Sequence, residues 1–263
     1  MENTINPLLN KAILPGETFK IPSQGLFYTR GELHPEVKNG ELYIKAMTAV
    51  DELAFKSPDL LYSGRSVEEV FSRCIPQVLK PRDLLSKDVD FLMLCLRMVT
   101  YGPELSITYD HKCSDESKEH NYMVKLQPIV QQAKRIDPTI TDKAFSLTLP
   151  NGQVVRLKPT TFGAMLDLNQ SVDVTDKVPS LQDVQTSVLS VLTDVIQSVD
   201  DVDNKEHIRE WVTSISAGWV RMISSSLGDV GEWGAQMIHK DKCRDCGEEI
   251  EIEFSTNPVS FFS

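Results

Sequence analysis

The chain is short of basic residues, and it lacks long apolar runs. Its 263 residues contain 27 Lys and Arg against 38 Asp and Glu, which gives a net charge of −11. An acidic surface repels phosphate backbones and anionic lipid headgroups unless a basic patch is set apart, and the sequence contains no such patch. No apolar run approaches the roughly 20 residues that a membrane-spanning helix needs. We therefore expect no nucleic-acid partner and no membrane partner.

The motifs of common enzyme active sites are also missing. There is no glycine-rich dinucleotide or phosphate loop and no Gly-x-Ser-x-Gly turn, and His207-Ile208-Arg209-Glu210 lacks the second histidine of a metalloprotease helix. We expect no catalytic residues, no small-molecule substrate and no enzymatic activity. The first residues lack the basic and apolar regions of a secretory signal, so we expect a protein made in the cytoplasm.

Cysteines are few, but two of them form a distinctive motif. Cys243-x-x-Cys246-Gly247 runs into the alternating apolar and acidic residues of 250–254. This spacing turns both sulfurs toward one ion, while Gly247 relieves strain in a turn whose backbone amides can donate to the thiolates. The motif predicts half of a zinc-ribbon site.

The other half of the site must come from elsewhere in the chain. Cys74 and Cys95 lie in apolar helical patterns and are interpreted as core residues. Cys113 instead lies in a strand, turn and strand with histidines nearby, which we interpret as a second, degenerate knuckle. We predict one structural zinc ion, with no open position for water, bound by Cys113, His120, Cys243 and Cys246, with His111 as the alternative fourth ligand and Asp110 or His239 as less favoured ones.

Two other interpretations of the Cys-x-x-Cys motif compete with the zinc site. One is a surface turn that binds nothing, and the other is a thiol oxidoreductase or metal-dependent enzyme. A redox motif normally places its first thiol at the N-terminus of a helix, whereas here a strand follows. The enzyme interpretation is therefore the less favoured one.

The pattern of apolar and turn-forming residues predicts an α+β protein. It favours two helical lobes, each with a small β element, joined by the pair of knuckles into a composite zinc-ribbon-like unit. Thr48 is expected to cap the first helix, and Pro150-Asn151-Gly152 is expected to turn a β-hairpin. The predicted domains are an extended or β segment at 1–50, a helical lobe at 51–125 ending in the first knuckle, a hairpin and helical lobe at 126–237, and the Cys-x-x-Cys knuckle with its tail at 238–263.

The order of parts is similar in the two halves. A strand, a threonine cap, helices and a knuckle follow Leu42, and the same series follows Val154. If this is a duplication, the zinc ion joins two equivalent lobes. The alternative is coincidence, since a strand followed by a capped helix is common.

Several short motifs, taken in order, carry a family resemblance. They are Pro22-Ser23-x-Gly25, a strand ending in Met47-Thr48, Leu96-Arg97 before Tyr101-Gly102-Pro103-Glu104, Cys243-x-x-Cys246-Gly247, and the closing Asn257-Pro258-x-x-Phe261-Phe262. Their order resembles the T4-like phage baseplate hub assembly family over much of the chain. Members commonly carry Cys-x-x-Cys in both knuckles, so Asp110 or His111 stands here in place of a first cysteine.

The resemblance implies a non-enzymatic role in building the baseplate or its central hub through contacts with other phage baseplate and hub proteins. It implies a location in the host cytoplasm during assembly, and in the virion if the protein is a subunit of the tail baseplate. The alternative role is an assembly chaperone absent from the mature virion. The aromatic tail at 257–263 is expected either to dock on a neighbouring subunit or to fold back on its own core.

Overall fold

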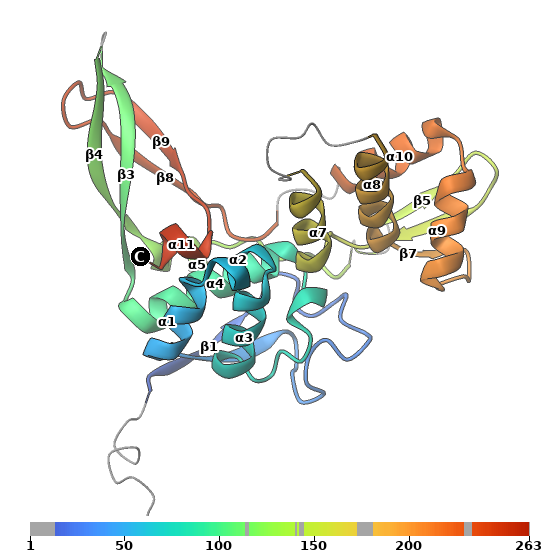
Figure 1. Ribbon diagram of the computed structural model, residues 1–263, viewed down its shortest axis with the longest axis horizontal. Coiled ribbons are helices and arrows are strands. Elements are labelled where there is room, and N and C mark those ends of the chain that lie inside the picture. The colour runs from blue at the N-terminus through green and yellow to red at the C-terminus, as the bar shows by residue number, and fades with distance from the viewer. Residues whose placement is uncertain are drawn as a thin grey trace, which may run out of the picture.

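The computed structural model describes residues 14–113, 116–139, 141, 145–172, 181–228 and 233–262. Its mixture of helices and short antiparallel sheets confirms the predicted α+β class. Two lobes built largely of helices lie next to each other, and two β-hairpins project together from the first lobe (Figure 1).

The first lobe packs a two-stranded sheet and a group of helices around one long helix. Strands β1 (Gly16–Lys20) and β2 (Glu41–Lys45) are antiparallel, and α1 (Ala49–Phe55), α2 (Pro58–Tyr62), α3 (Arg65–Cys74), the 3₁₀ helix η2 (Pro81–Asp83) and α4 (Ser86–Tyr101) follow. Helix α4 is buried around most of its circumference from Phe91 to Arg97, which is typical of a central core helix. Cys95 in α4 and Cys74 in α3 are buried core residues, as predicted.

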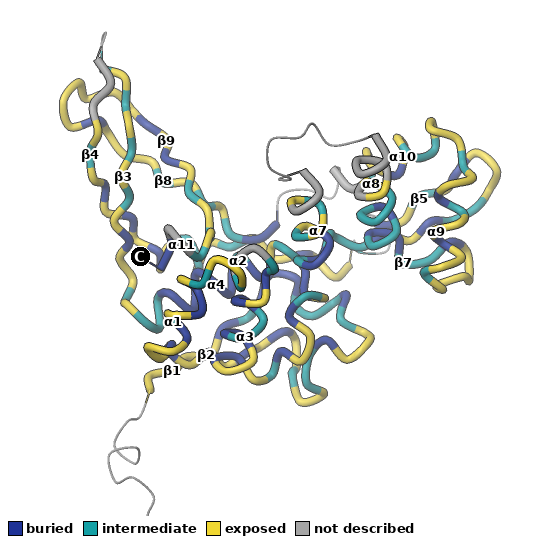
Figure 2. The backbone as a smooth tube through the Cα atoms, viewed as in Figure 1, coloured by how far each residue is buried: buried dark blue, intermediate teal, exposed yellow. Residues whose placement is uncertain are grey.

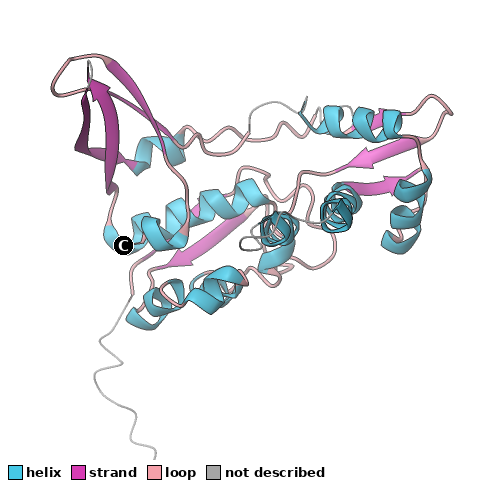
Figure 3. Cartoon of the chain, turned by 45° about the horizontal axis from the view of Figure 1, so that its top comes forward, coloured by secondary structure: helices cyan, strands magenta, loops and turns pink. Residues whose placement is uncertain are grey.

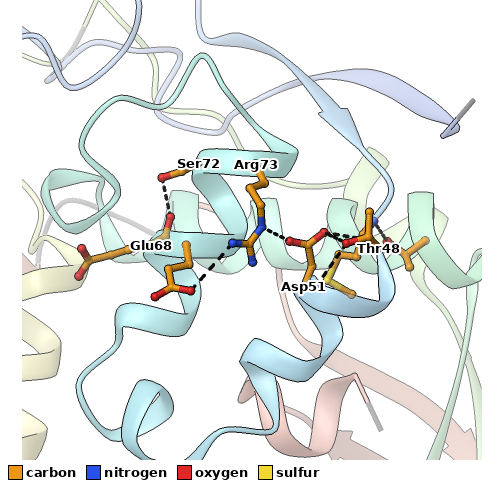
Figure 4. A network of polar contacts seen from close by, with 8 residues as sticks. Thr48, Asp51, Glu68, Ser72 and Arg73 are labelled. Atoms are coloured by element: carbon orange, nitrogen blue, oxygen red, sulfur yellow. Dashed lines mark hydrogen bonds and ion pairs between the residues drawn. The ribbon is translucent and has the colours of Figure 1, made fainter. Parts of the chain in front are cut away.

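The expected cap of helix α1 is present and ties this helix to α3. Thr48 Oγ1 accepts a hydrogen bond from the Asp51 backbone N–H, while Asp51 accepts from the Thr48 N–H, so the two residues form a capping box. Arg73 from α3 pairs with the same carboxylate (Figure 4). Burial alone would raise the pKa of Asp51, but the hydrogen bonds from Thr48 and Arg73 lower it below its usual value. The cap predicted from the local sequence and the ion pair formed by tertiary packing therefore stabilise the same carboxylate of Asp51.

A buried carboxylate joins the N-terminal loop to the start of α4. The Ser23 backbone N–H donates to Asp88 Oδ1 at 3.0 Å, and the Tyr28 hydroxyl donates to Asp88 Oδ2 at 2.7 Å. The Asp88 side chain is fully buried, and burial raises its pKa to about 6. The carboxyl group is therefore accommodated more easily in its neutral form than in its charged form.

Asp88→Asn is expected to flatten the pH dependence of stability. Because the pKa of Asp88 rises from 3.8 to about 6 on folding, its stabilising contribution is present below pH 4 and is lost as pH rises through 6. The free energy of unfolding of the wild type, relative to the variant, should fall by roughly 2.4 kcal/mol between pH 4 and pH 7. Urea unfolding of both proteins across this range measures the difference. Parallel curves for the two proteins would contradict the prediction.

The second lobe repeats the sheet-and-helix arrangement. Strands β5 (Ser146–Thr148), β6 (Val154–Leu157) and β7 (Ile196–Val199) form an antiparallel sheet, with α7 (Phe162–Val172), α8 (Leu181–Val195), α9 (Lys205–Ser214) and α10 (Ala217–Gly228) beside it. Strands β5 and β6 form the predicted hairpin around Pro150-Asn151-Gly152. Apolar residues from 136 to 233, together with Phe27 and Leu85 from the first lobe, form its core.

The two halves share the order of parts that the sequence indicates. Thr161 Oγ1 accepts from the Ala164 backbone N–H at 3.3 Å at the start of α7, much as Thr48 caps α1. Each half also ends in a hairpin, β3 (Glu104–Cys113) with β4 (Glu116–Lys125) and β8 (Ile238–Lys242) with β9 (Glu249–Glu253). The duplication itself stays a prediction, as do the domain boundaries at 50, 125 and 237. Strands β1 and β2, from the predicted segment 1–50, share one core with α4, from the predicted lobe 51–125.

The C-terminal tail folds back on the first lobe. Helix α11 (Pro258–Phe261) places Phe261 and Phe262 in the first core, with 2% and 3% of their surfaces exposed. The Phe262 ring stacks on Phe55 with centroids 4.8 Å apart, and Arg97 Nη1 donates to the Phe261 carbonyl at 2.6 Å. Of the two expectations for this tail, the structure shows docking on its own core. Residues 1–13 lie outside the described part of the chain.

Candidate metal centre

The two hairpins face each other and share a small core. They run next to each other in both Figure 1 and Figure 3. Strand β9 alternates exposed and buried residues (Figure 2), and its buried Ile250 and Ile252 pack with Tyr122 of β4 and with Cys243. Alternate residues of a strand point to one face, so His111 and Cys113 of β3 share a face. The segments that carry the two predicted knuckles are therefore brought together.

The turn between β8 and β9 has the geometry expected of the Cys-x-x-Cys-Gly motif. The Cys243 N–H donates to the Glu248 carbonyl at 2.8 Å, and the Gly247 N–H donates to the Cys243 carbonyl at 2.9 Å. Gly247 has a φ of 74°, in the left-handed region that glycine adopts without strain. Both thiols of the motif consequently lie on one side of a closed turn.

Four side chains from the two hairpins converge at one point. The ligand atoms of His111, Cys113, Cys243 and Cys246 all lie within 4.8 Å of one another. The Sγ atoms of Cys113 and Cys243 are 3.3 Å apart, and Cys246 Sγ lies 3.4 Å from His111 Nε2. A tetrahedral zinc ion, with bonds of about 2.3 Å to sulfur and 2.0 Å to nitrogen, separates its ligand atoms by roughly 3.5 to 4 Å. The cluster therefore has the donors and nearly the spacing that one metal ion requires.

The favoured fourth ligand, His120, lies outside this cluster. Strand register pairs His120 with Tyr109. Tyr109 lies on the same face of β3 as His111, but two residues further from the turn of the hairpin. Its Nε2 lies 3.4 Å from Asp245 Oδ2, and its ring packs edge-on against Tyr122. The geometry thus unites the three predicted cysteines with the alternative ligand, His111. In the sequence, the spacing of His111 and Cys113 could have indicated His111 as the ligand, because it places both side chains on one face of a strand.

The less favoured candidates are also outside the cluster. Asp110 neighbours His111 in β3, so strand alternation turns it to the opposite face. His239 Nε2 lies 3.6 Å from Asp241 Oδ2 within β8. In the part of the chain that the structure describes, His111 and the three cysteines form the only group of three or more such side chains close enough to hold one ion.

Comparison with known families identifies the protein class. The family model described as T4 bacteriophage base plate protein matches residues 37–263. The chain belongs to the T4 bacteriophage base plate protein family. The matched range contains both hairpins and all four clustered side chains. Neither the curated proteins nor the solved structures yield a match.

Membership of the base plate family supports a structural role in a phage baseplate and agrees with the resemblance seen in the sequence. Within the described residues, no helix of this base plate protein combines the length and the apolar character that crossing a bilayer requires.

Hydrogen bonds in this base plate protein favour the thiolate form of Cys243, which is the form that binds metal. Hydrogen bonds from the backbone N–H groups of Cys246 and Asp245 lower the pKa of Cys243 to about 6. The hydrogen bond between the sulfurs of Cys113 and Cys243 raises the pKa of Cys113 to about 12. The opposite directions of the two pKa shifts favour the thiolate form at Cys243 and the thiol form at Cys113. A bound cation would take the place of the proton on Cys113.

Proposed function

We propose that this base plate protein acts without catalysis in assembling the baseplate or its central hub, through contacts with other phage baseplate and hub proteins. The observation that carries this proposal is the family match over residues 37–263, which covers the first lobe from β2 onward, the second lobe and both hairpins. The acidic chain and its lack of a basic patch favour protein partners over nucleic acid, lipid or a small-molecule substrate.

A structural zinc site belongs to the same proposal. Three thiols and one imidazole form a soft donor set that suits zinc, and four protein ligands leave no position for a reactive water molecule. Each hairpin alone is a two-stranded unit with little apolar surface, and the core between them is small. Zinc bound by His111, Cys113, Cys243 and Cys246 would supply the cross-link that holds the hairpins together.

The exposure of the thiols supports a structural role over thiol oxidoreductase activity. A redox motif needs its low-pKa sulfur at the surface, where a substrate can reach it. Here the thiol with the lowered pKa is Cys243, which is only 2% exposed. The motif also lies in a turn between two strands instead of at the start of a helix.

Purified phage particles and infected lysate test the proposed role. We expect the protein in particles at a fixed number of copies, measured by quantitative mass spectrometry, together with about one zinc ion per chain in the purified protein. Its presence in baseplate assembly intermediates but not in particles would assign it instead as a chaperone. Its absence from both would overturn the proposed function.

A further inference from the structure

A pocket lies where the two lobes and the C-terminal tail meet. Its volume is about 680 Å³, and it is lined by the start of α3, by α4, by α7 and by the segment 254–258 between β9 and α11. Helix α7 lies at the junction of the two lobes (Figure 1). The Leu166 side chain of α7 occupies the space that a side chain on Gly64 would need. The pocket is therefore formed by segments that are far apart in the chain.

Asp90 gives this pocket a negative charge. Among the described residues that line it, Asp90 alone is ionisable. Asp90 Oδ1 accepts a hydrogen bond from Thr256 Oγ1 at 2.6 Å, and the carboxylate forms no ion pair with another described residue. Burial raises the pKa of Asp90 above its usual value, although the bond from Thr256 and the charge of Lys87 oppose this rise. A carboxylate in such surroundings is stabilised by a bound cation.

Two other charges near Asp90 do not change the sign of the pocket. Lys87 precedes Asp90 by one turn of α4, but it does not line the pocket, and its Nζ lies 5.2 Å from the centre of the Trp233 ring. The N-terminus of α3 also borders the pocket, and the positive end of a helix carries about half a charge. Glu68 in the first turn of α3 offsets that half charge. The full negative charge of Asp90 therefore dominates, and the pocket favours a cation.

Ser66 adds a hydrogen-bonding group that lacks a partner. This residue lines the pocket and is only 1% exposed, and its Oγ bonds to no other described residue. A buried hydroxyl group without a partner costs free energy, which a ligand N–H that donates to it would recover. The pocket thus offers a carboxylate and a free hydroxyl oxygen to one ligand.

These acceptors suit an ammonium group on an alkyl chain. Phe162 and Phe254 supply apolar surface for methylene groups. A guanidinium fork uses both oxygens of a carboxylate, but Thr256 already occupies Asp90 Oδ1. An ammonium group instead has three N–H donors for separate acceptors, such as Asp90 Oδ2 and Ser66 Oγ. A free diamine would bring a second charge, for which the described lining offers no second carboxylate. A lysine side chain meets all these conditions.

We propose that this pocket binds a lysine side chain of another baseplate protein. The methylene groups of the lysine lie against Phe162 and Phe254, and its ammonium group donates to Asp90 Oδ2 and Ser66 Oγ. The assignment of the lysine to a baseplate protein rests on the proposed function, whereas the pocket stands on its own geometry.

Capped amino acids test the pocket on the full-length protein. The probes are the N-acetyl methylamides of lysine, norleucine and arginine, which differ in the end group of the side chain, and diaminobutane represents a free diamine. Two-dimensional NMR of the backbone amides measures binding. We expect the lysine probe to shift the signals of Ser66, Asp90 and Phe254 in a saturable way and to bind at least ~10-fold more tightly than norleucine. Arginine and diaminobutane should bind more weakly than lysine.

Two variants and a matched control identify the groups that bind the probe. Asp90→Asn removes the charge but keeps an oxygen that can accept from Thr256, and it should weaken binding of the lysine probe at least ~10-fold. Ser66→Ala breaks no hydrogen bond of the described residues and should weaken binding at least ~3-fold. Asp201→Asn makes the same change of charge at an exposed position of the second lobe and should bind as the wild type does.

Three results would overturn the proposal. They are equal binding of the lysine and norleucine probes, unchanged affinity in both Asp90→Asn and Ser66→Ala, and signal shifts confined to residues outside the pocket. Tighter binding of arginine or diaminobutane than of lysine would also overturn it, because the ligand would then be a guanidinium group or a free diamine.

Carbodiimide cross-linking distinguishes failure of this inference from failure of the proposed function. The reagent joins a carboxylate to an amine as an amide and takes up the water that is lost, becoming a urea. In particles or assembly intermediates, mass spectrometry should find Asp90 linked to a lysine of another baseplate protein. If the protein is present there without such a link, or is linked through Asp90 to a second copy of itself, the inference is wrong and the baseplate role stands. If the protein is absent from both while the lysine probe binds, the assignment of the partner fails with the proposed function.

Discussion

Replacing Cys243 by serine is expected to abolish zinc binding and to destabilise the protein by at least ~3 kcal/mol, because metal binding contributes directly to folding at sites of this kind. Cys243 is the buried member of the cluster and carries the thiol whose pKa is lowered to about 6, so serine removes the best-prepared ligand. Zinc content by elemental analysis and urea unfolding, each with and without a chelator, measure both effects. A chelator should destabilise the wild type and leave Cys243→Ser unchanged.

Histidine variants provide the matched control and identify the fourth ligand. His111→Gln should weaken zinc binding at least ~100-fold, since His111 Nε2 lies within the cluster. His120→Gln changes the same residue type on the same hairpin but outside the cluster, and it should retain zinc. The reverse result would restore His120 as the ligand. Full zinc content in Cys243→Ser would exclude the site altogether.

Phe262→Ala is expected to destabilise the protein by about 3 to 5 kcal/mol. The Phe262 side chain is 3% exposed and stacks on Phe55 of α1, so its removal leaves a cavity where the tail joins the first core. Helix α11 has only four residues, and the buried side chains of Phe261 and Phe262 anchor it together with the hydrogen bond from Arg97. Urea unfolding at neutral pH measures the loss.

Leu53→Ala serves as the control for the tail. Leu53 is a large apolar residue on α1 but is 64% exposed, so its truncation should change stability by no more than about 0.5 kcal/mol. A loss below about 1 kcal/mol for Phe262→Ala would mean that the tail is not docked on its own core in solution. Docking on a neighbouring subunit, the other expectation for this tail, would then regain support.

Local features of this protein could be predicted from the sequence because they depend on residues only a few positions apart. Thr48 and Asp51 form a capping box across three residues, and the Cys243-x-x-Cys246-Gly247 turn is closed by hydrogen bonds within itself. The β5–β6 hairpin likewise follows from the turn chemistry of Pro150-Asn151-Gly152. The order of such local units was also sufficient to indicate the α+β class and the phage family.

Features that depend on distant segments were decided only by the tertiary structure. Both His111 and His120 were compatible with the spacing of the knuckle, and only strand register and the approach of β8 and β9 placed His111 beside the cysteines. The burial of Phe262 against Phe55 likewise depends on contact between segments far apart in the chain. A strand does not encode which segments meet its faces and edges, because hydrogen bonding and burial there depend on elements far away in the chain.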